Sequence, residues 1–180
     1  RLHALCVLCA DASLLLSVRA LCPNLAEFRL SSPTHEGALQ SKSVESALQA
    51  LTVTTCNVRS LYLSRYINLS DEQIQVLAHA PIQTLRISKC DKITSSGMLR
   101  LVATLSHLHT LEICYCKSVK PDVIAKIPQI CVNLRNFTYS RQSCECGSGC
   151  WCSMQMAPDA FANEMLHALF PQVNKFSISF

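Results

Sequence analysis

The apolar and polar positions of the chain follow one recurring pattern: an apolar residue, two others, a second apolar residue, one other, and a third apolar residue. The pattern is complete six times and partial once. The copies are Leu2/Leu5/Val7 (partial), Leu25/Phe28/Leu30, Val58/Leu61/Leu63, Ile82/Leu85/Ile87, Leu108/Leu111/Ile113, Leu134/Phe137/Tyr139 and Val173/Phe176/Ile178. Their first residues lie 23, 33, 24, 26, 26 and 39 positions apart, which indicates a repeated unit of about 25 residues with two expansions.

Each copy predicts a short strand followed by a helix, because apolar residues that alternate along a strand bury one of its faces. Helix signals follow the triplets: Ser70 to Gln73 form a capping box before Ile74, and Pro121 stands where a first helical turn tolerates it. A unit with a single apolar face must stack on its neighbours to bury that face. We therefore expect residues 1–180 to form one α/β domain of about seven repeats, with a loop insertion at 32–43 and a cysteine-rich insertion at 140–157.

Three stretches of the chain resemble the cysteine-containing class of leucine-rich repeats found mainly in F-box proteins. They are "CPNLAEFRL" (22–30), "IQTLRISKCDKITSSGM" (82–98) and "LHTLEICYCKSVKPDVI" (108–124). In that class a cysteine stands three positions after the third apolar residue, as Cys90 and Cys116 do here. A segment of the form I-T-D-x-G then leads into the helix, and residues 93–97 match it with Ser95 in place of the aspartate. Other repeats depart from the class, with Pro33, Tyr66 and Gln142 at the cysteine position.

The resemblance implies a right-handed leucine-rich-repeat solenoid, or horseshoe, with a parallel concave β-sheet and convex helices. It also implies a protein-protein interaction module, namely the substrate-recognition repeats of an F-box type adaptor of a cullin-RING ubiquitin ligase. No F-box pattern precedes the first repeat, so we expect a fragment of a longer protein that meets ubiquitin-ligase subunits only through a missing F-box region. The alternative is a structural or scaffold repeat domain of a larger assembly with no ubiquitin role.

The residues between the ladder positions point to the opposite side of each strand and form the expected concave surface. Its middle column contains residue types that anchor many protein interfaces, with arginine and tyrosine foremost. We predict that this column binds a partner protein; a merely solvated sheet face is the alternative. The column reads Arg29, Tyr62, Arg86, Glu112 and Thr138.

Four cysteines are clustered in the second insertion, within "SCECGSGCWC": Cys144, Cys146, Cys150 and Cys152. Four thiolates can enclose a tetrahedral zinc ion, although structural zinc sites more often have at least two residues between paired cysteines. Free thiols and paired disulfides remain alternatives. Trp151, the only tryptophan, lies in the same segment and either anchors it to the domain or contacts a partner.

The composition, the charge and the cysteine content of the chain further limit its possible partners and its cellular compartment. The chain is 49% hydrophobic and only 16% charged, below the usual charged share of about a quarter, which excludes a disordered chain or a polar linker. Its net charge of +4 comes from scattered residues rather than from a basic run. We expect no nucleic-acid partner and no membrane partner. The 12 cysteines include several at equivalent repeat positions, as buried thiols would be, which favours the reducing cytoplasm or nucleus.

Catalysis is not expected. The only constellation to weigh is a cysteine near one of His79, His107, His109 or His167, and these histidines are expected to be ordinary surface or structural residues. The chain contains no glycine-rich phosphate loop and no nucleophile elbow. We therefore expect a chain that is not an enzyme and that binds no cofactor other than the candidate zinc ion.

Overall fold

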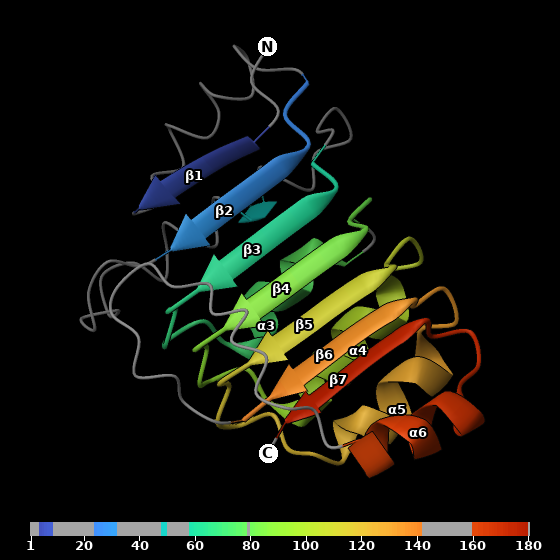
Figure 1. Cartoon of the computed structure of the whole chain (residues 1–180). Helices are drawn as coiled ribbons and strands as arrows, with labels where there is room; N and C mark the ends of the chain where they lie inside the picture. Colours follow the sequence, from blue (N-terminus) through green and yellow to red (C-terminus); the bar gives the residue numbers. More distant parts are fainter. Residues whose placement is uncertain are drawn as a thin grey trace.

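The computed structural model describes residues 4–8, 24–31, 48–49, 58–78, 80–141 and 160–179. A sheet of seven strands runs through these residues, all of them parallel and arranged in the order of the sequence (Figure 1). Each strand contains five residues. The strands are β1 (Ala4–Leu8), β2 (Glu27–Ser31), β3 (Ser60–Ser64), β4 (Thr84–Ser88), β5 (Thr110–Cys114), β6 (Asn136–Ser140) and β7 (Lys175–Ser179).

The apolar triplets stand side by side in this sheet, as the sequence predicts. Leu85 of β4 lies beside Leu61 of β3 and Leu111 of β5, and the third positions are aligned in the same way. From β2 to β7 the ladder residues are buried, whereas their neighbours in each strand are mostly half-buried. Even the one polar ladder residue is satisfied, because the Tyr139 hydroxyl donates a hydrogen bond to the Val119 carbonyl at 2.9 Å.

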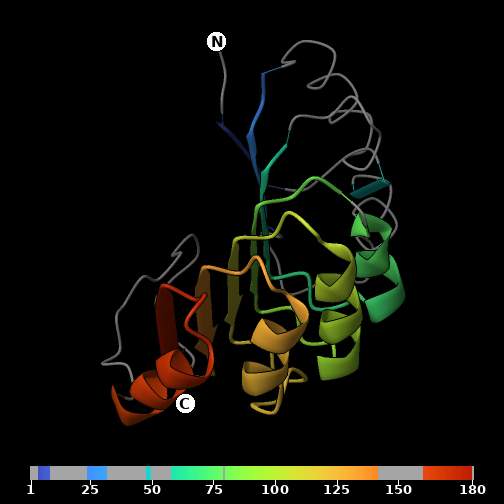
Figure 2. The ribbon, with the colours of Figure 1, turned by 90° about the vertical axis from the view of Figure 1, so that its right-hand side faces the viewer.

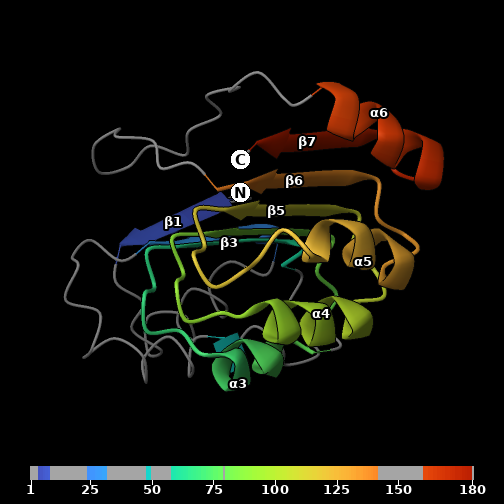
Figure 3. The ribbon, with the colours of Figure 1, turned by 90° about the horizontal axis from the view of Figure 1, so that it is seen from below.

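The helices are short and follow the strands. They are α3 (Asp71–Ile74), which continues into the 3-10 helix η1 (Gln75–Leu77), α4 (Ser95–Thr104), α5 (Val123–Ile130) and α6 (Ala160–Leu169). Figures 2 and 3 show a curved sheet with α3, α4 and α5 side by side on its convex side, and α6 packs against β7. The predicted mixed α/β class with a parallel sheet and helices is confirmed.

The predicted helix starts are confirmed in one case and shifted in another. The capping box is present: the Ser70 hydroxyl accepts from the Gln73 amide at 3.4 Å, and the Gln73 side chain accepts from the Ser70 amide at 3.1 Å. The helix after Pro121 begins only at Val123, with Asp122 at the N-cap position. Pro121 therefore precedes the first helical turn rather than lying in it.

A second repeated feature lies immediately after the strands. Arg65, Lys89 and Tyr115, which follow β3, β4 and β5, have positive φ angles of 63°, 54° and 58°. The amide of each donates to the last carbonyl of the next strand, at distances between 2.7 and 3.0 Å. This left-handed backbone conformation is unfavourable by roughly 1–2 kcal/mol for each non-glycine residue. The repeated hydrogen bond holds the three residues in it.

Polar side chains also connect each helix start to the next repeat. The Asp71 carboxylate accepts from the amide of Thr94 at 2.8 Å and from its hydroxyl at 2.6 Å. One repeat further on, the Ser95 hydroxyl accepts from the Lys120 amide at 2.9 Å. Ser95, which replaces the aspartate of the family pattern, therefore makes the equivalent contact through a hydroxyl instead of a carboxylate.

Three of the described cysteines at repeat positions, Cys90, Cys116 and Cys131, are buried free thiols, as the sequence predicts for packing groups, whereas Cys114 is half-buried. Cys90 and Cys116 are buried, and their thiols donate to the carbonyls of Ser88 and Cys114 at 3.4 and 3.5 Å. Burial raises the pKa of Cys90 to about 12 and raises the pKa of Cys116 further. Tyr66, at the same position of an earlier repeat, is also buried.

Both insertions lie outside the described residues, apart from Ser140 and Arg141 at the start of the second. The segment 32–43, the four clustered cysteines and Trp151 are therefore left as the sequence predicts them. The same holds for Pro33 and Gln142.

Candidate functional site

The middle column identified in the sequence forms a continuous line across the sheet. Arg29 pairs in register with Tyr62, Tyr62 with Arg86, Arg86 with Glu112, and Glu112 with Thr138. These five residues, called the strip below, lie on the strand face opposite the buried ladder. No described helix or strand covers this face, on which the five side chains stand in one row.

Tyr62 is buried within the strip, which its sequence context does not reveal. Its ring lies between two guanidinium groups, with the central carbon of Arg29 4.6 Å and that of Arg86 4.8 Å from the ring centroid. Only 6% of Tyr62 is exposed. The two arginines from neighbouring strands cover the ring. A partner that approaches the strip would meet the guanidinium groups before it meets the ring.

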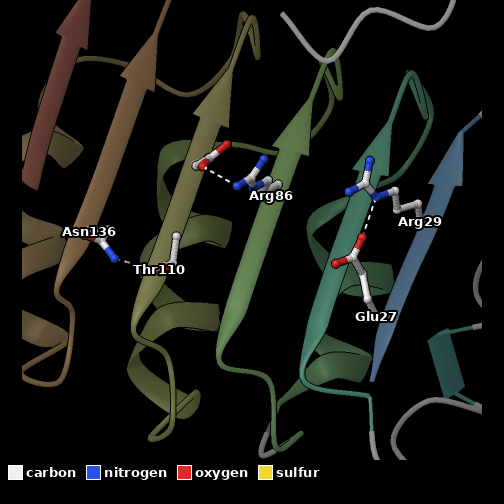
Figure 4. Close-up of polar contacts among 6 residues, drawn as sticks. Glu27, Arg29, Arg86, Thr110 and Asn136 are labelled. Carbon is white, nitrogen blue, oxygen red and sulfur yellow. Dashed lines mark hydrogen bonds and ion pairs between the residues drawn. The ribbon is translucent and has the colours of Figure 1, made fainter. Parts of the chain in front are cut away.

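Each arginine of the strip is also held by a carboxylate (Figure 4). Arg29 donates through Nε to Glu27 Oε1 at 2.6 Å, and Arg86 Nη2 lies 3.1 Å from Glu112 Oε1. About a third of each arginine side chain is exposed, 38% and 34%, so solvent weakens these ion pairs. The pairs matter because they orient the arginines. Stacking on the Tyr62 ring and one ion pair with a carboxylate hold each guanidinium group in place before a partner binds.

The electrostatics of the strip are set mainly by burial and pairing. Burial raises the pKa of the Glu112 carboxyl, and the nearby charges of Arg86 and Lys175 act in the opposite direction. The hydrogen bond that Arg29 donates to the Glu27 carboxylate raises the pKa of the Arg29 guanidinium, which stays charged. Arg86 Nε is buried and has no hydrogen-bond partner within the described part of the chain. Neither arginine has therefore used all of its donors.

Beside the strip, the outward residues at the start of β5 and β6 form a contact between uncharged side chains. The Asn136 amide donates to the Thr110 hydroxyl at 3.1 Å across β5 and β6 (Figure 4). Thr138 is half-buried at the end of the strip. Sequence reasoning placed Glu27 on the same strand face as Arg29, two residues away, but did not include it in the predicted binding column.

Compared with models of protein families and with curated proteins, the sequence matches none of them. The likeness to cysteine-containing leucine-rich repeats therefore depends on the residues quoted above and on their repeated contacts.

Two further features bear on function. Among the described residues, no helix is long and apolar enough to cross a bilayer. Within the same ranges, no three side chains of the His, Cys, Asp and Glu types gather as metal ligands would. Cys144, Cys146, Cys150 and Cys152 lie outside those ranges, so the zinc site stays a prediction. Trp151 as a partner contact stays one too.

Proposed function

We propose that this chain is a leucine-rich-repeat solenoid whose strand face binds another protein, and that it serves as the substrate-recognition part of an F-box type ubiquitin-ligase adaptor. The fold part of the proposal is supported by contacts that recur from repeat to repeat. Equivalent residues after β3, β4 and β5 have positive φ angles, and Cys90 and Cys116 are buried at equivalent positions. A chain of identical units with sequential parallel strands is how a solenoid is built.

The binding part of the proposal depends on one observation, the pair of guanidinium groups held over the Tyr62 ring. Arginine and aromatic residues supply a large share of the energy of protein interfaces, and groups already held in place lose little entropy on binding. The arrangement includes no nucleophile with an adjacent base, so we assign it recognition and no catalysis.

A pull-down with paired charge reversals tests the strip. Arg29→Glu together with Arg86→Glu should lower the recovery of the bound protein from cell extract by at least about tenfold, because two anchor residues are lost. Tyr62 is left unchanged, since removing a buried ring would leave a cavity. The matched control reverses two exposed cations of the helices, Arg100→Glu with Lys126→Glu, and should retain the protein. Equal recovery with both variants would remove the strip from consideration.

The ubiquitin-ligase part of the proposal is separable, because it depends on the cysteine pattern and on an F-box that would lie outside these 180 residues. A protein that carries these repeats together with an F-box should co-purify with a cullin subunit, and the present chain alone should not. A parent that retains the strip-dependent partner but no cullin would favour the scaffold alternative.

A further inference from the structure

The charges of the described residues are divided unequally between the strands and the rest of the chain. Strands β2 to β7, each taken with the residue before it and the residue after it, carry eight basic and two acidic side chains, a net charge of +6. The acidic ones are Glu27 and Glu112. Besides Arg29 and Arg86, the basic ones are Arg59, Arg65, Lys89, Arg135, Arg141 and Lys175. All other described residues carry five charges of each sign.

Three of these cations form a row at the carboxyl ends of the strands. Arg65, Lys89 and Arg141 directly follow β3, β4 and β6. Their spacing is set by the sheet, because the amides of Arg65 and Lys89 donate to the last carbonyls of β4 and β5 at 2.9 and 3.0 Å. The ammonium group of Lys89 lies 5.9 Å from the centre of the Tyr115 ring, the remaining member of the row. This basic row borders the strip along one edge of the sheet.

The carboxylates of the strip neutralise its arginines only in part. Each arginine gives one nitrogen to a carboxylate, and Arg86 Nε lacks a hydrogen-bond partner among the described residues. Hydrogen bonds from a guanidinium to a carboxylate are about twice as strong as neutral ones, so the remaining donors favour anionic groups. The face is thus basic overall, and about a third of each arginine side chain is exposed to a partner, although Arg86 Nε itself is buried.

We infer that the segment bound across this sheet is an acidic stretch of polypeptide. Its Asp and Glu carboxylates would accept from Arg29 and Arg86, and its remaining charge would face the row of Arg65, Lys89 and Arg141. The inference deepens the proposed function and rests on it, because it names the chemical class of the protein segment bound there. Glu27 and Glu112 stand among the arginines and would repel an unbroken phosphate backbone, so the face fits a peptide with spaced charges better than a nucleic acid.

The test is selection from a random peptide display library on the whole chain, followed by binding of the selected peptides in solution. Selected peptides should be enriched in Asp and Glu, and their affinity should fall steeply as salt rises. Arg29→Gln with Arg86→Gln should weaken binding by at least about tenfold. Arg100→Gln with Lys126→Gln removes two exposed charges from the helices and should change it less than about twofold.

A second variant leaves Arg29 and Arg86, which cover the Tyr62 ring, unchanged. Arg65→Asn with Lys89→Asn removes two charges of the basic row and places a residue that tolerates positive φ at both positions. This variant should fold at least as well as the parent chain, as circular dichroism would show, and should bind the selected peptides roughly threefold more weakly.

The remaining outcomes separate the two claims. Neutral or basic peptides whose binding is lost in the Arg29→Gln/Arg86→Gln variant would overturn the acidic class and leave the proposed function standing. If no selected peptide depends on the strip, both fail. Acidic peptides weakened equally by the helix control, or a single-stranded oligonucleotide that binds as tightly as the peptides, would also overturn the inference.

Discussion

Gly97 allows one sharp test of how neighbouring repeats are joined. It is the third residue of α4 and is buried, and the three atoms nearest to a Cβ added there all belong to the Asp71 carboxylate of the preceding repeat, which such a Cβ would overlap. That carboxylate is not free to move, because it accepts from the amide and the hydroxyl of Thr94. The Thr94 hydroxyl in turn accepts from the Gly97 amide at 3.2 Å and caps α4.

The magnitude follows from these contacts. In a helix, Gly→Ala ordinarily stabilises by about 0.5–1 kcal/mol. Here Gly97→Ala must displace Asp71 and disrupt two hydrogen bonds to a charged group, each contributing about 1.5–3 kcal/mol. We expect a net loss of about 2–5 kcal/mol in the free energy of unfolding. In an Asp71→Ala background the obstacle is gone, so the same Gly97→Ala change should stabilise by up to about 1 kcal/mol.

Urea unfolding followed by circular dichroism measures the four members of this cycle. Asp91→Ala supplies the matched control, since Asp91 is also an aspartate that contacts the next repeat, but its partner is Lys117 instead of α4. In that background Gly97→Ala should cost as much as in the parent chain. A cost that is equal, within about 0.5 kcal/mol, with and without Asp71 would refute the contact and with it this account of repeat coupling.

Two further predictions concern cysteines. Burial raises the pKa of Cys90 and of Cys114 to about 12, so at pH 8 their thiolate populations are depleted by about three orders of magnitude relative to an ordinary thiol. Iodoacetamide should therefore modify the exposed Cys6 before the half-buried Cys114 and should reach the buried Cys90 only after unfolding; equal labelling rates of Cys6 and Cys90 by mass spectrometry would contradict the burial of Cys90. For the cluster of Cys144, Cys146, Cys150 and Cys152, protein purified without chelator should contain about one zinc ion per chain by elemental analysis, and a content near zero would leave free thiols or disulfides.

The register of the sheet could be predicted from the sequence because the same apolar triplet recurs. Placing Phe28, Leu61 and Leu85 at equivalent positions already aligns Arg29, Tyr62 and Arg86 on the other face, since side chains alternate along a strand. The alignment of β2 to β7 follows this logic at every position. The repeat thus determines which backbone positions are equivalent, and these positions determine which residues form the strip.

The burial of Tyr62 could not be predicted, because it depends on three repeats at once. A tyrosine flanked by serines or threonines at the same positions would stand exposed, whereas here arginines from β2 and β4 both turn over its ring. The close approach of the Asp71 carboxylate to Gly97 could not be predicted either, because the two residues lie 26 positions apart and in different repeats. Positive φ at Arg65, Lys89 and Tyr115 also lacked a local signal, because none of them is Gly or Asn.

Packing explains the inner face of the sheet but not the charge of the outer one. Ladder positions are limited to apolar residues by burial, whereas the outward positions of the same strands contact no core and tolerate either sign of charge. The described helices and loops carry equal numbers of both signs, which is what an unselective surface would show, yet strands β2 to β7 and their flanking residues carry a net +6. Core stability does not require this difference, and like charges so close together cost energy in the free chain. A bound anionic partner offsets that cost, which makes recognition a better account of the outer face than stability.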